Sequence, residues 1–363
     1  MNGQSLRDLY LSDGPQQFAD KCVRLLREGK VRPEDFSLRE LWEAVGRPGF
    51  GSMRNILEAL GSDAPLREEA VNTSVFNVIT GELINRKVIE GYESYPAIGD
   101  ELVTVVSSRR REERFPGLGA LDMPVEVKEA EDYPELGGLD EKYVTSTATK
   151  KGMIISITEE LITEDQTGLV LLRAKQVGER IRRDREKTIL NGIQDVNGNV
   201  YRPDGQAVAL YSAANGNLLT GNSLVDWTDL DAAYAHFINM QDEAGEPMYV
   251  EPQVLLVPVS LRGTANRIVN ATEFDTGNMT VGNSYSHLKA LASPYLDAQS
   301  TTTWYIGDFK RQFVWHEVWP VQVLRARQDS DQAFERDIVA RFKARYLGGI
   351  AALDYRYVIK CTA

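Results

Sequence analysis

The sequence predicts an α+β protein, because its helix signals and its strand signals occupy different stretches of the chain. Short helical patterns fill residues 1–65, a long helical pattern spans 164–193, and β-prone runs lie at 71–108 and 338–360. At 363 residues the chain is long enough for two or three domains and for burying roughly 75% of the surface that its unfolded form exposes. A core of this size does not depend on disulfides for its stability.

The first 65 residues contain two capped helix patterns. In "FSLRELWEAVG", Ser37 and Glu40 have the spacing of a capping box and Gly46 supplies a stop. The apolar stripe of this helix comprises Leu38, Leu41, Trp42 and Val45. The stretch "SMRNILEALG" repeats the pattern between Ser52 and Gly61. Neither helix is long enough to be stable alone, so both are expected to pack on the rest of the chain or on another copy.

A charge-sorted segment follows two β-prone runs, "SVFNVITG" at 74–81 and "LVTVVSS" at 102–108. It begins with Arg109, Arg110, Arg111 and Arg114 and continues with the carboxylates Glu126, Glu129, Glu131, Asp132, Glu135, Asp140 and Glu141. Lys128 is the only base among these carboxylates. A further β-prone run, "GMIISIT" at 152–158, closes the segment. Because the 43 residues at 109–151 are too many for a hairpin turn and too polar for a core, they predict a projecting excursion.

The longest helical signal is "EDQTGLVLLRAKQVGERIRRDREKTILNGI". Glu164 and Asp165 lie at its N-terminal end, and Gly192 ends the pattern. Its apolar positions are Val170, Ala174, Val177 and Ile181, and its polar face carries Arg180, Arg182, Arg183 and Arg185. A helix of about 27 residues is a rod of roughly 40 Å, and an amphipathic core helix explains the pattern without any binding role.

The second half of the chain predicts an α/β unit and a strand-rich tail. A helix in "DWTDLDAAYAHFINMQDEAG" precedes the continuous apolar run Val254 to Val259, which is typical of a strand buried on both faces, and Ser260 is placed to cap the next helix. In the tail, Ile338, Ala340, Phe342, Ala344 and Tyr346 alternate with Arg341, Lys343 and Arg345. Two strands joined through Gly348 and Gly349 would account for this alternation.

The motifs of common enzymes are missing from the sequence. His236, His287 and His316 lie in unrelated contexts, so a zinc site is not expected. The nucleophile elbow and the phosphate-binding loop are absent, and "GLGALD" lacks the third glycine of a dinucleotide site. The loop from Asp195 resembles a calcium loop, but Gln206 stands where a bidentate glutamate belongs. We therefore expect no catalytic residue, no metal and no cofactor, although a soluble hydrolase remains a minor alternative.

The composition of the chain argues against disulfide bonds, a membrane span and tight DNA binding. The two cysteines, Cys22 and Cys361, stand at opposite ends and exclude a disulfide framework. No apolar run reaches the 18 or so residues of a membrane span, which predicts a soluble protein without a membrane partner. A formal net charge of −12 argues against tight sequence-independent DNA binding, which requires clustered Lys and Arg. If the protein meets DNA, its net negative charge suits it to enclose the DNA and not to bind it tightly.

One long stretch resembles a known family: "YSAANGNLLTGNSLVDWTDLDAAYAHFINMQDEAGEPMYVEPQVLLVPVSLRGTANRIVNA". It is similar to the run of an aromatic-Ser-Ala turn, an Asn-Leu step, a helix and a strand ending in "LLVP" in the major capsid proteins of tailed bacteriophages, which have the Hong Kong 97 (HK97)-type fold. Within that family it looks closest to the Mu-like major head subunits. The resemblance covers roughly residues 80–363, and the tail from Phe334 to Lys360 resembles the family's closing strands.

The resemblance implies a division of the chain into arm, loop and domains. From the N-terminus, it comprises an N-terminal helical arm (1–70), the first part of a peripheral domain (71–106), an extended loop (107–157), more of the peripheral domain (158–223) with a spine helix at about 165–192, an axial domain (224–303), a peripheral return (304–347) and a C-terminal strand (348–363).

By the same resemblance, the chain would be a major capsid protein that self-assembles into an icosahedral shell around double-stranded phage DNA. Its partners would be copies of itself in pentamers and hexamers, DNA bound without specificity, the portal, and scaffold, protease or decoration proteins. It would assemble in the host bacterial cytoplasm and reside in the virion. An encapsulin-type compartment shell, which shares the fold, is the alternative. The family's covalent cross-link needs an asparagine near the C-terminus, but no asparagine follows Asn283, so we expect a non-covalent lattice.

The candidate functional residues are charged positions of the extended loop, expected to contact neighbouring subunits. They are Arg109, Arg110, Arg111, Arg114, Glu129, Glu131, Asp132 and Glu135. Each exposed ion pair contributes only about 0.2–1 kcal/mol, so the contact would depend on many such pairs repeated around a closed lattice.

Overall fold

The structure is a computed structural model of the chain. It describes residues 10, 12–32, 38–45, 64–116, 143–164, 168–242, 245–275, 280–326 and 338–363, and for residues 43, 64–74, 159, 163, 164 and 339 only the backbone. The acidic part of the predicted loop, from Glu126 to Glu141, lies outside the described residues, as does the helix expected between Ser52 and Gly61. No helix of the described part is long and apolar enough to cross a membrane.

The chain divides into two compact units. Unit 1 comprises residues 1–96, 150–183 and 321–346, and unit 2 comprises 97–149, 184–320 and 347–363. Three of the boundaries between the units fall within helix α8 (Leu169–Ile193) and strands β11 (Phe313–Arg325) and β12 (Ile338–Ala352). The other two lie between residues 96 and 97 and at the start of strand β4. The domain boundaries implied by the resemblance remain a prediction.

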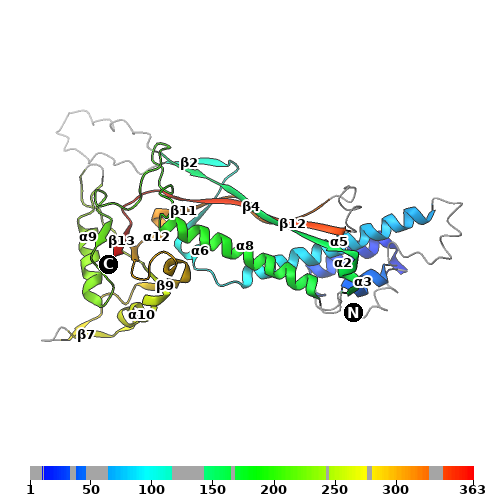
Figure 1. Cartoon of the computed structure of the whole chain (residues 1–363), viewed down its shortest axis with the longest axis horizontal. Helices are drawn as coiled ribbons and strands as arrows, with labels where there is room; N and C mark the ends of the chain where they lie inside the picture. The colour runs from blue at the N-terminus through cyan, green and yellow to red at the C-terminus, as the bar shows by residue number, and fades with distance from the viewer. Residues whose placement is uncertain are drawn as a thin grey trace, which may run out of the picture. The chain divides into compact units, whose positions relative to one another are not determined.

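Unit 1 is mainly helical. Its helices are α2 (Pro15–Arg27), α3 (Leu38–Ala44), α5 (Ala64–Ser94), α7 (Glu159–Glu164) and the first part of α8, and strand β4 (Thr149–Thr158) follows the loop (Figure 1). Helix α3 confirms the helix predicted at 38–45, and Leu38, Leu41, Trp42 and Val45 are all buried. Trp42 packs edge-on against Phe76 of α5, with ring centroids 4.7 Å apart.

Helices α5 and α8 approach each other closely because glycines face the partner backbone. A Cβ atom on Gly91 would lie 2.0 Å from the carbonyl oxygen of Lys175, and one on Gly178 would lie 2.0 Å from that of Val88. Any larger residue at these positions would therefore push the helices apart. Beside this contact, the guanidinium of Arg182 lies 4.9 Å from the ring centroid of Tyr92. The arginine-rich face of α8 is thus partly occupied by packing within unit 1.

Two expectations for unit 1 were wrong. The run at 74–81 was expected to be a strand but lies inside α5, where the buried residues Val75, Phe76, Ile79 and Leu83 follow a helical spacing. Tertiary packing of this apolar face outweighs the strand preference of its β-branched residues. The long helix was expected from Glu164, but this residue ends the separate helix α7, and α8 begins at Leu169 after Gly168, whose φ is +67°.

Unit 2 is built on a five-stranded mixed sheet in the order β5-β13-β10-β6-β9. Its strands are β5 (Leu218–Thr220), β6 (Val254–Pro258), β9 (Lys289–Ser293), β10 (Trp304–Gly307) and β13 (Val358–Thr362). Strand β6 confirms the predicted buried strand, since Leu255, Leu256 and Val257 are at most 1% exposed. The pairing brings strands from distant parts of the sequence into one sheet, including the C-terminal β13 beside β10 and β5.

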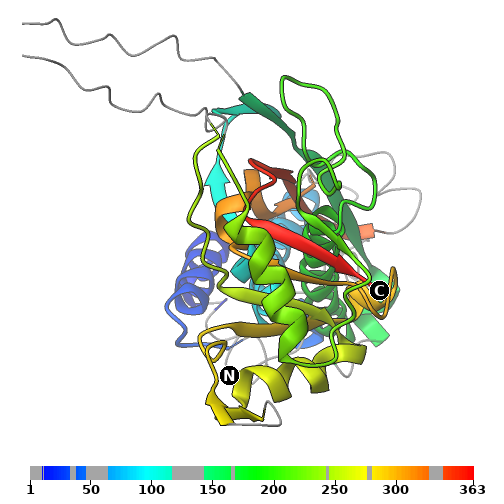
Figure 2. The ribbon, with the colours of Figure 1, turned by 90° about the vertical axis from the view of Figure 1, so that its left-hand side faces the viewer.

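Helices and short strands complete unit 2. They are α6 (Gly99–Leu102), β1 (Thr104–Ser107), α9 (Trp227–Ile238), the short helix η1 (Val259–Leu261), α10 (Arg262–Asn270), β7 (Glu273–Asp275), β8 (Thr280–Gly282), α11 (Pro294–Asp297) and α12 (Phe309–Gln312). Helix α9, capped by Asp226, lies across the sheet in front of β13 in Figure 2. Its residues Leu230, Ala233 and Phe237 join the hydrophobic core of the sheet.

Ser260 does not cap the helix that follows it. Helix α10 starts at Arg262 with no side-chain cap, and the hydroxyl of Ser260 donates instead to the carboxylate of Asp297. The backbone N–H of Val259 donates to the same carboxylate at 2.6 Å. The Ser260 hydroxyl, which the local pattern predicts at the N-cap of the helix, is therefore hydrogen-bonded to Asp297, a residue distant in sequence.

A second sheet has the strand order β1-β11-β12-β4. The predicted alternation of the tail is confirmed in β12, where Ala340, Phe342, Ala344 and Tyr346 are buried. The expected turn at Gly348 and Gly349 was wrong, since β12 runs through both glycines. A Cβ on Gly348 would lie 2.6 Å from the Trp315 ring, and one on Gly349 would lie 2.5 Å from a backbone oxygen. Glycine is needed there for close packing and not for a turn.

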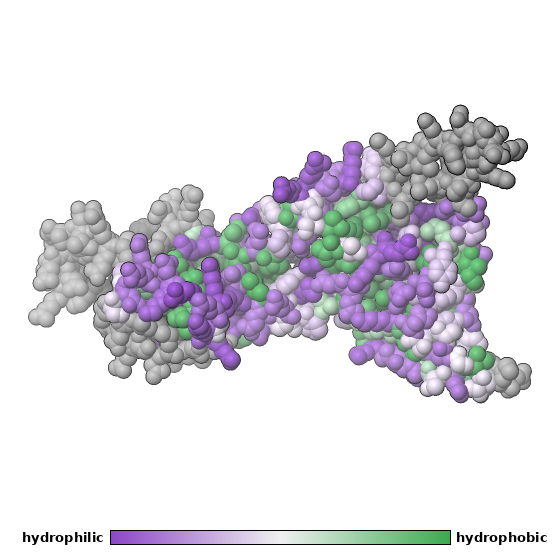
Figure 3. Space-filling model, turned by 180° about the vertical axis from the view of Figure 1, so that it is seen from behind, coloured by the Kyte–Doolittle hydropathy of each residue, from purple (hydrophilic) through white to green (hydrophobic). Residues whose placement is uncertain are grey.

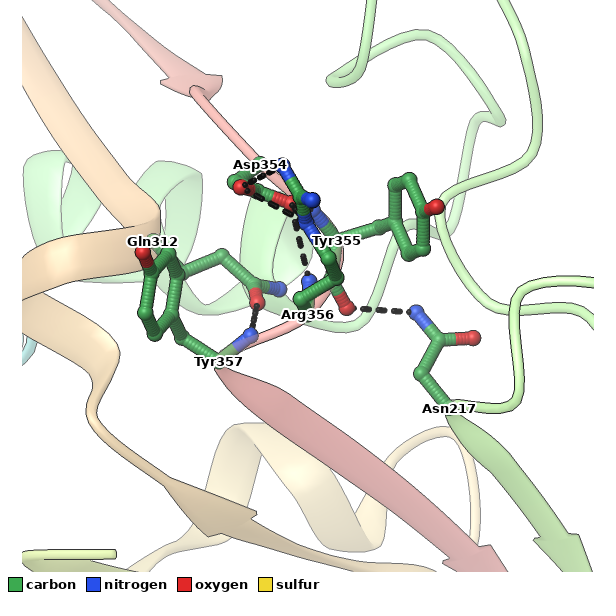
Figure 4. A network of polar contacts seen from close by, with 6 residues as sticks. All are labelled: Asn217, Gln312, Asp354, Tyr355, Arg356 and Tyr357. Carbon is green, nitrogen blue, oxygen red and sulfur yellow. Dashed lines mark hydrogen bonds and ion pairs between the residues drawn. The ribbon is translucent and has the colours of Figure 1, made fainter. Parts of the chain in front are cut away.

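The true connection between β12 and β13 is a polar turn that follows Leu353. The Arg356 guanidinium contacts both carboxylate oxygens of Asp354 at 2.8–3.1 Å, and this pair is buried (Figure 4). The side-chain oxygen of Gln312 accepts from the backbone N–H of Tyr357 at 3.0 Å, and the Asn217 amide donates to the carbonyl oxygen of Tyr355 at 2.9 Å. These bonds hold the turn against two other segments of unit 2.

Candidate functional site: the base of the charged loop

Within unit 2, the described part of the predicted loop forms a two-stranded ribbon. Strand β2 (Glu112–Pro116) pairs antiparallel with β3 (Tyr143–Thr147), and Glu112 lies opposite Thr147 while Pro116 lies opposite Tyr143. The ribbon places Arg114 on β2 and the other three candidate arginines in the short connection from β1. All four arginine side chains are exposed. The structure thus brings the predicted basic group together at the base of the loop.

Several hydrogen bonds hold the connection between β1 and β2. The backbone N–H of Ser108 donates to the carbonyl oxygen of Glu317 at 2.9 Å, and its hydroxyl donates to the carboxylate of Glu113. The backbone N–H of Ala148 donates to the carbonyl oxygen of Arg111 at 2.8 Å. Because β1 itself pairs in parallel with β11, the arginines stand on a backbone anchored to a sheet.

Below the ribbon lies a buried histidine. His316 on β11 is 0% exposed, and the Phe115 ring packs edge-on against it with centroids 6.0 Å apart. Burial lowers the pKa of His316, while the negative charge of Glu113 acts in the opposite direction. The imidazole is therefore held neutral beneath the loop base at neutral pH, where it serves packing.

The four guanidinium groups have few partners in the described parts of the chain. None of them forms an ion pair there; Arg114 lies over the Tyr143 ring at 4.5 Å, and Arg111 donates to the carbonyl oxygen of Ala148 at 3.3 Å. Arg109 and Arg110 are exposed in the connection between β1 and β2. The loop base thus presents a cluster of cationic groups that a surface carrying carboxylates could bind.

The other candidate residues, Glu129, Glu131, Asp132 and Glu135, lie outside the described residues. Sequence reasoning also missed Tyr143 and His316, which support Arg114 and the ribbon. Only the strand register, which places Tyr143 at the start of β3 beside the end of β2, would have pointed to the first of these. Within the described part, no group of three or more His, Cys, Asp or Glu side chains could hold a metal ion.

The sequence model of one protein family matches most of the chain. The family is described as "Phage capsid protein", and the match spans residues 142–361, which include β3 of the loop base and nearly all of the five-stranded sheet of unit 2. The chain belongs to the phage capsid protein family. It is a structural protein of the virion and not an enzyme, and the predicted function of a major capsid protein that builds an icosahedral shell is confirmed.

Solved structures agree with the predicted fold. A chain from Microbacterium phage Oxtober96 matches with a TM-score of 0.50 and 13% identity, over 73% of this chain and 90% of that one. One from Mycobacterium phage Adephagia has a TM-score of 0.49 and 14% identity, over 73% and 89%, and a capsid of a native GTA particle has 0.48 and 12%, over 72% and 88%. No curated protein matches significantly. The α+β, HK97-type fold is confirmed.

Proposed function

We propose that the arginines at the loop base bind an acidic surface of a neighbouring subunit in the capsid. The observation that carries this proposal is the exposed cluster of Arg109, Arg110, Arg111 and Arg114, which lacks ion-pair partners in the described parts of the chain and stands on an anchored ribbon. Four such cations raise the local potential, which favours a partner that carries carboxylates. A capsid lattice supplies this partner in every subunit.

Exposed apolar side chains support further contacts between copies. Val225, Ile238 and Tyr249 of unit 2 are 70%, 75% and 84% exposed, although hydrophilic residues cover most of the face shown in Figure 3. Apolar side chains that are exposed in one subunit are available for burial against another copy. They fit the assembly of copies into pentamers and hexamers.

The type of phage particle, its contents and its other proteins are also part of the proposal. The shell would be of the Mu-like type, would enclose double-stranded DNA, and would contain a portal and accessory scaffold, protease or decoration proteins. The net charge of −12 supports a container whose walls do not hold the packaged polymer tightly. The lattice would be non-covalent, because no asparagine follows Asn283 to accept a lysine from the loop.

Charge reversal tests the role of the arginines. A variant with Arg109→Glu, Arg110→Glu, Arg111→Glu and Arg114→Glu is expected to stay folded by circular dichroism but to form far fewer shells in electron micrographs of purified material. A matched variant carries the same charge change at the exposed residues Arg173, Arg180, Arg262 and Arg267 and should assemble normally. If both variants assembled equally well, the result would show that the loop base takes no part in the contacts between subunits.

Salt provides a second measure of the same contact. Wild-type shells should lose stability in high salt, because the Debye length falls from about 8 Å at 0.15 M to about 3 Å at 1 M ionic strength. Particles devoid of DNA would contradict the proposed enclosure of double-stranded DNA.

A further inference from the structure

Strand β4 forms one edge of the four-stranded sheet. It pairs with β12 along one side, and no described strand pairs with its other side (Figure 1). The strand is ten residues long, from Thr149 to Thr158, and contains neither proline nor an acidic residue. The free side of such a strand presents a row of backbone N–H and C=O groups to which a further strand can bond.

The side chains of β4 are apolar although the strand lies at an edge. Because successive side chains point to opposite faces of a sheet, Met153, Ile155 and Ile157 share one face and Ile154 lies on the other. Ile157 is 0% exposed, whereas Met153 is 37% and Ile154 is 58% exposed. The middle of the edge therefore offers apolar surface on both faces as well as backbone hydrogen-bonding groups.

The charged residues that would deter an incoming strand stand at only one end of β4. Lys150 and Lys151 lie within the first three residues, and the seven residues from Gly152 to Thr158 carry no charge. An antiparallel copy of the same strand would place its own lysines opposite this uncharged end. Like charges, which are unfavourable directly opposite each other, would then be kept apart.

A two-fold axis through Ile154 gives such a pairing. Each residue of one copy then lies opposite a residue of the second copy, with 150 opposite 158, 151 opposite 157, 152 opposite 156, 153 opposite 155, and 154 opposite itself. Directly opposed residues of an antiparallel pair point to the same face and contact each other. The exposed apolar side chains would thus pack together, and no lysine would face a lysine.

We propose that β4 pairs antiparallel with β4 of a second copy of the chain across a two-fold axis in the capsid. The self-complementary order of the strand favours a second copy as the partner, and a shell supplies copies at a high local concentration. The pairing joins two sheets into one and buries Met153 and Ile154. It is separate from the arginine contact, because residues 150–158 belong to unit 1 and the loop base belongs to unit 2.

Position 154 of the full-length chain tests the pairing, because only a two-fold contact brings this residue opposite itself. Ile154→Lys alone and Ile154→Asp alone should each lower the yield of shells in electron micrographs about tenfold, since like charges would then meet in every pair. An equimolar mixture of the two variants should raise the yield about fivefold above either one, because lysine can then lie opposite aspartate. Normal assembly of either variant alone, or no recovery in the mixture, would overturn the inference.

Leu172 on α8 provides the matched control. It is an apolar residue of unit 1 that is 52% exposed, and Leu172→Lys adds the same charge away from the edge of the sheet. This variant should assemble normally, and its midpoint in urea denaturation should equal that of Ile154→Lys. An equal loss of shells from both lysine variants would contradict the proposed pairing.

A disulfide gives an independent readout. The Cα atoms of directly opposed residues in an antiparallel pair are about 4.5–5.5 Å apart, which a disulfide can bridge. The native Cys22 and Cys361 are buried. Oxidised shells of Ile154→Cys should therefore contain mostly linked dimers on a non-reducing gel, and shells of Leu172→Cys mostly monomers. Monomers from both variants would overturn the inference.

The outcomes separate this inference from the proposed function. Shells that assemble without Ile154→Cys dimers would exclude the β4 pairing and leave the arginine contact intact. Normal assembly of the variant with four arginines reversed would instead exclude the arginine contact, while Ile154→Cys dimers would still support the pairing.

Discussion

Arginine serves two opposite purposes in unit 2. Arg356 is buried and meets the Asp354 carboxylate with two nitrogens at 2.8–3.1 Å, and both side chains are at most 6% exposed (Figure 4). The arginines of the loop base are exposed and lack ion pairs in the described parts of the chain. A buried guanidinium is tolerated only with its partner, whereas an exposed one is solvated and remains available. One region stabilises the subunit, and the other is suited to bind its neighbour.

The largest expected effect comes from breaking the buried pair. Asp354→Ala leaves the Arg356 charge buried without its carboxylate and should lower the free energy of unfolding by about 3–5 kcal/mol. Urea denaturation of the unassembled subunit measures this loss. The double variant Asp354→Ala with Arg356→Met should recover much of it, because the isolated charge is gone. A loss below about 1 kcal/mol for the single variant would contradict the comparison.

A pH effect is expected from the histidine beneath the loop base. Burial lowers the pKa of His316 below its ordinary value, which is about 6.5. The unfolded chain therefore binds a proton at a higher pH than the folded chain does. Stability is fully present above pH 6.5 and is lost as pH falls from there through the lowered pKa.

The measurement for His316 is a difference between two proteins. The free energy of unfolding is followed from pH 7.5 to pH 5 for the wild type and for His316→Gln, which has no charge to gain. The wild type should lose more stability than the variant in this window, and parallel curves would show that His316 does not titrate differently in the two states.

Arg114 lies between the two extremes because its guanidinium covers the Tyr143 ring at 4.5 Å. Exposed cation–π contacts contribute about 0.5–1 kcal/mol. Arg114→Ala should destabilise the subunit by this amount in urea denaturation, and Tyr143→Leu should cause a similar loss. Non-additive losses in the double variant would confirm that the two side chains interact.

The smallest effect on stability is expected at Arg109 and Arg110. Each change to Ala should alter the free energy of unfolding by no more than about 0.5 kcal/mol, because both side chains are exposed. The same variants should nevertheless reduce shell formation, as counted by electron microscopy. A stability loss comparable to that of Asp354→Ala would show that the loop base stabilises the subunit itself.

The sequence predicted those parts of the fold whose pattern is local. The alternation at 340–346, the buried strand at Val254–Pro258 and the long helix α8 are confirmed, because each pattern reports the period of its own backbone. The cluster of basic residues at the candidate site was equally visible, since four arginines within six positions need no partner to be recognised.

The errors occurred where a distant residue decided the outcome. Residues 74–81 are helical because their apolar side chains pack in unit 1, and Ser260 bonds to Asp297 although its position suits a helix cap. Tyr143 and His316 could not be found because the register that brings them to the ribbon joins segments far apart in sequence.

The sequence by itself determined the sorting of charge, the alternation of the tail and the chemistry of the loop, since these depend on residue order alone. Only the tertiary structure decided that Gly348 and Gly349 lie within a strand, because the reason is the Trp315 ring and a backbone oxygen that press against them. The tertiary structure also decided which arginines are exposed and available to bind another subunit. Arg356 and Arg109 carry the same charge, and their roles differ because burial with a carboxylate partner depends on contacts that no local pattern records.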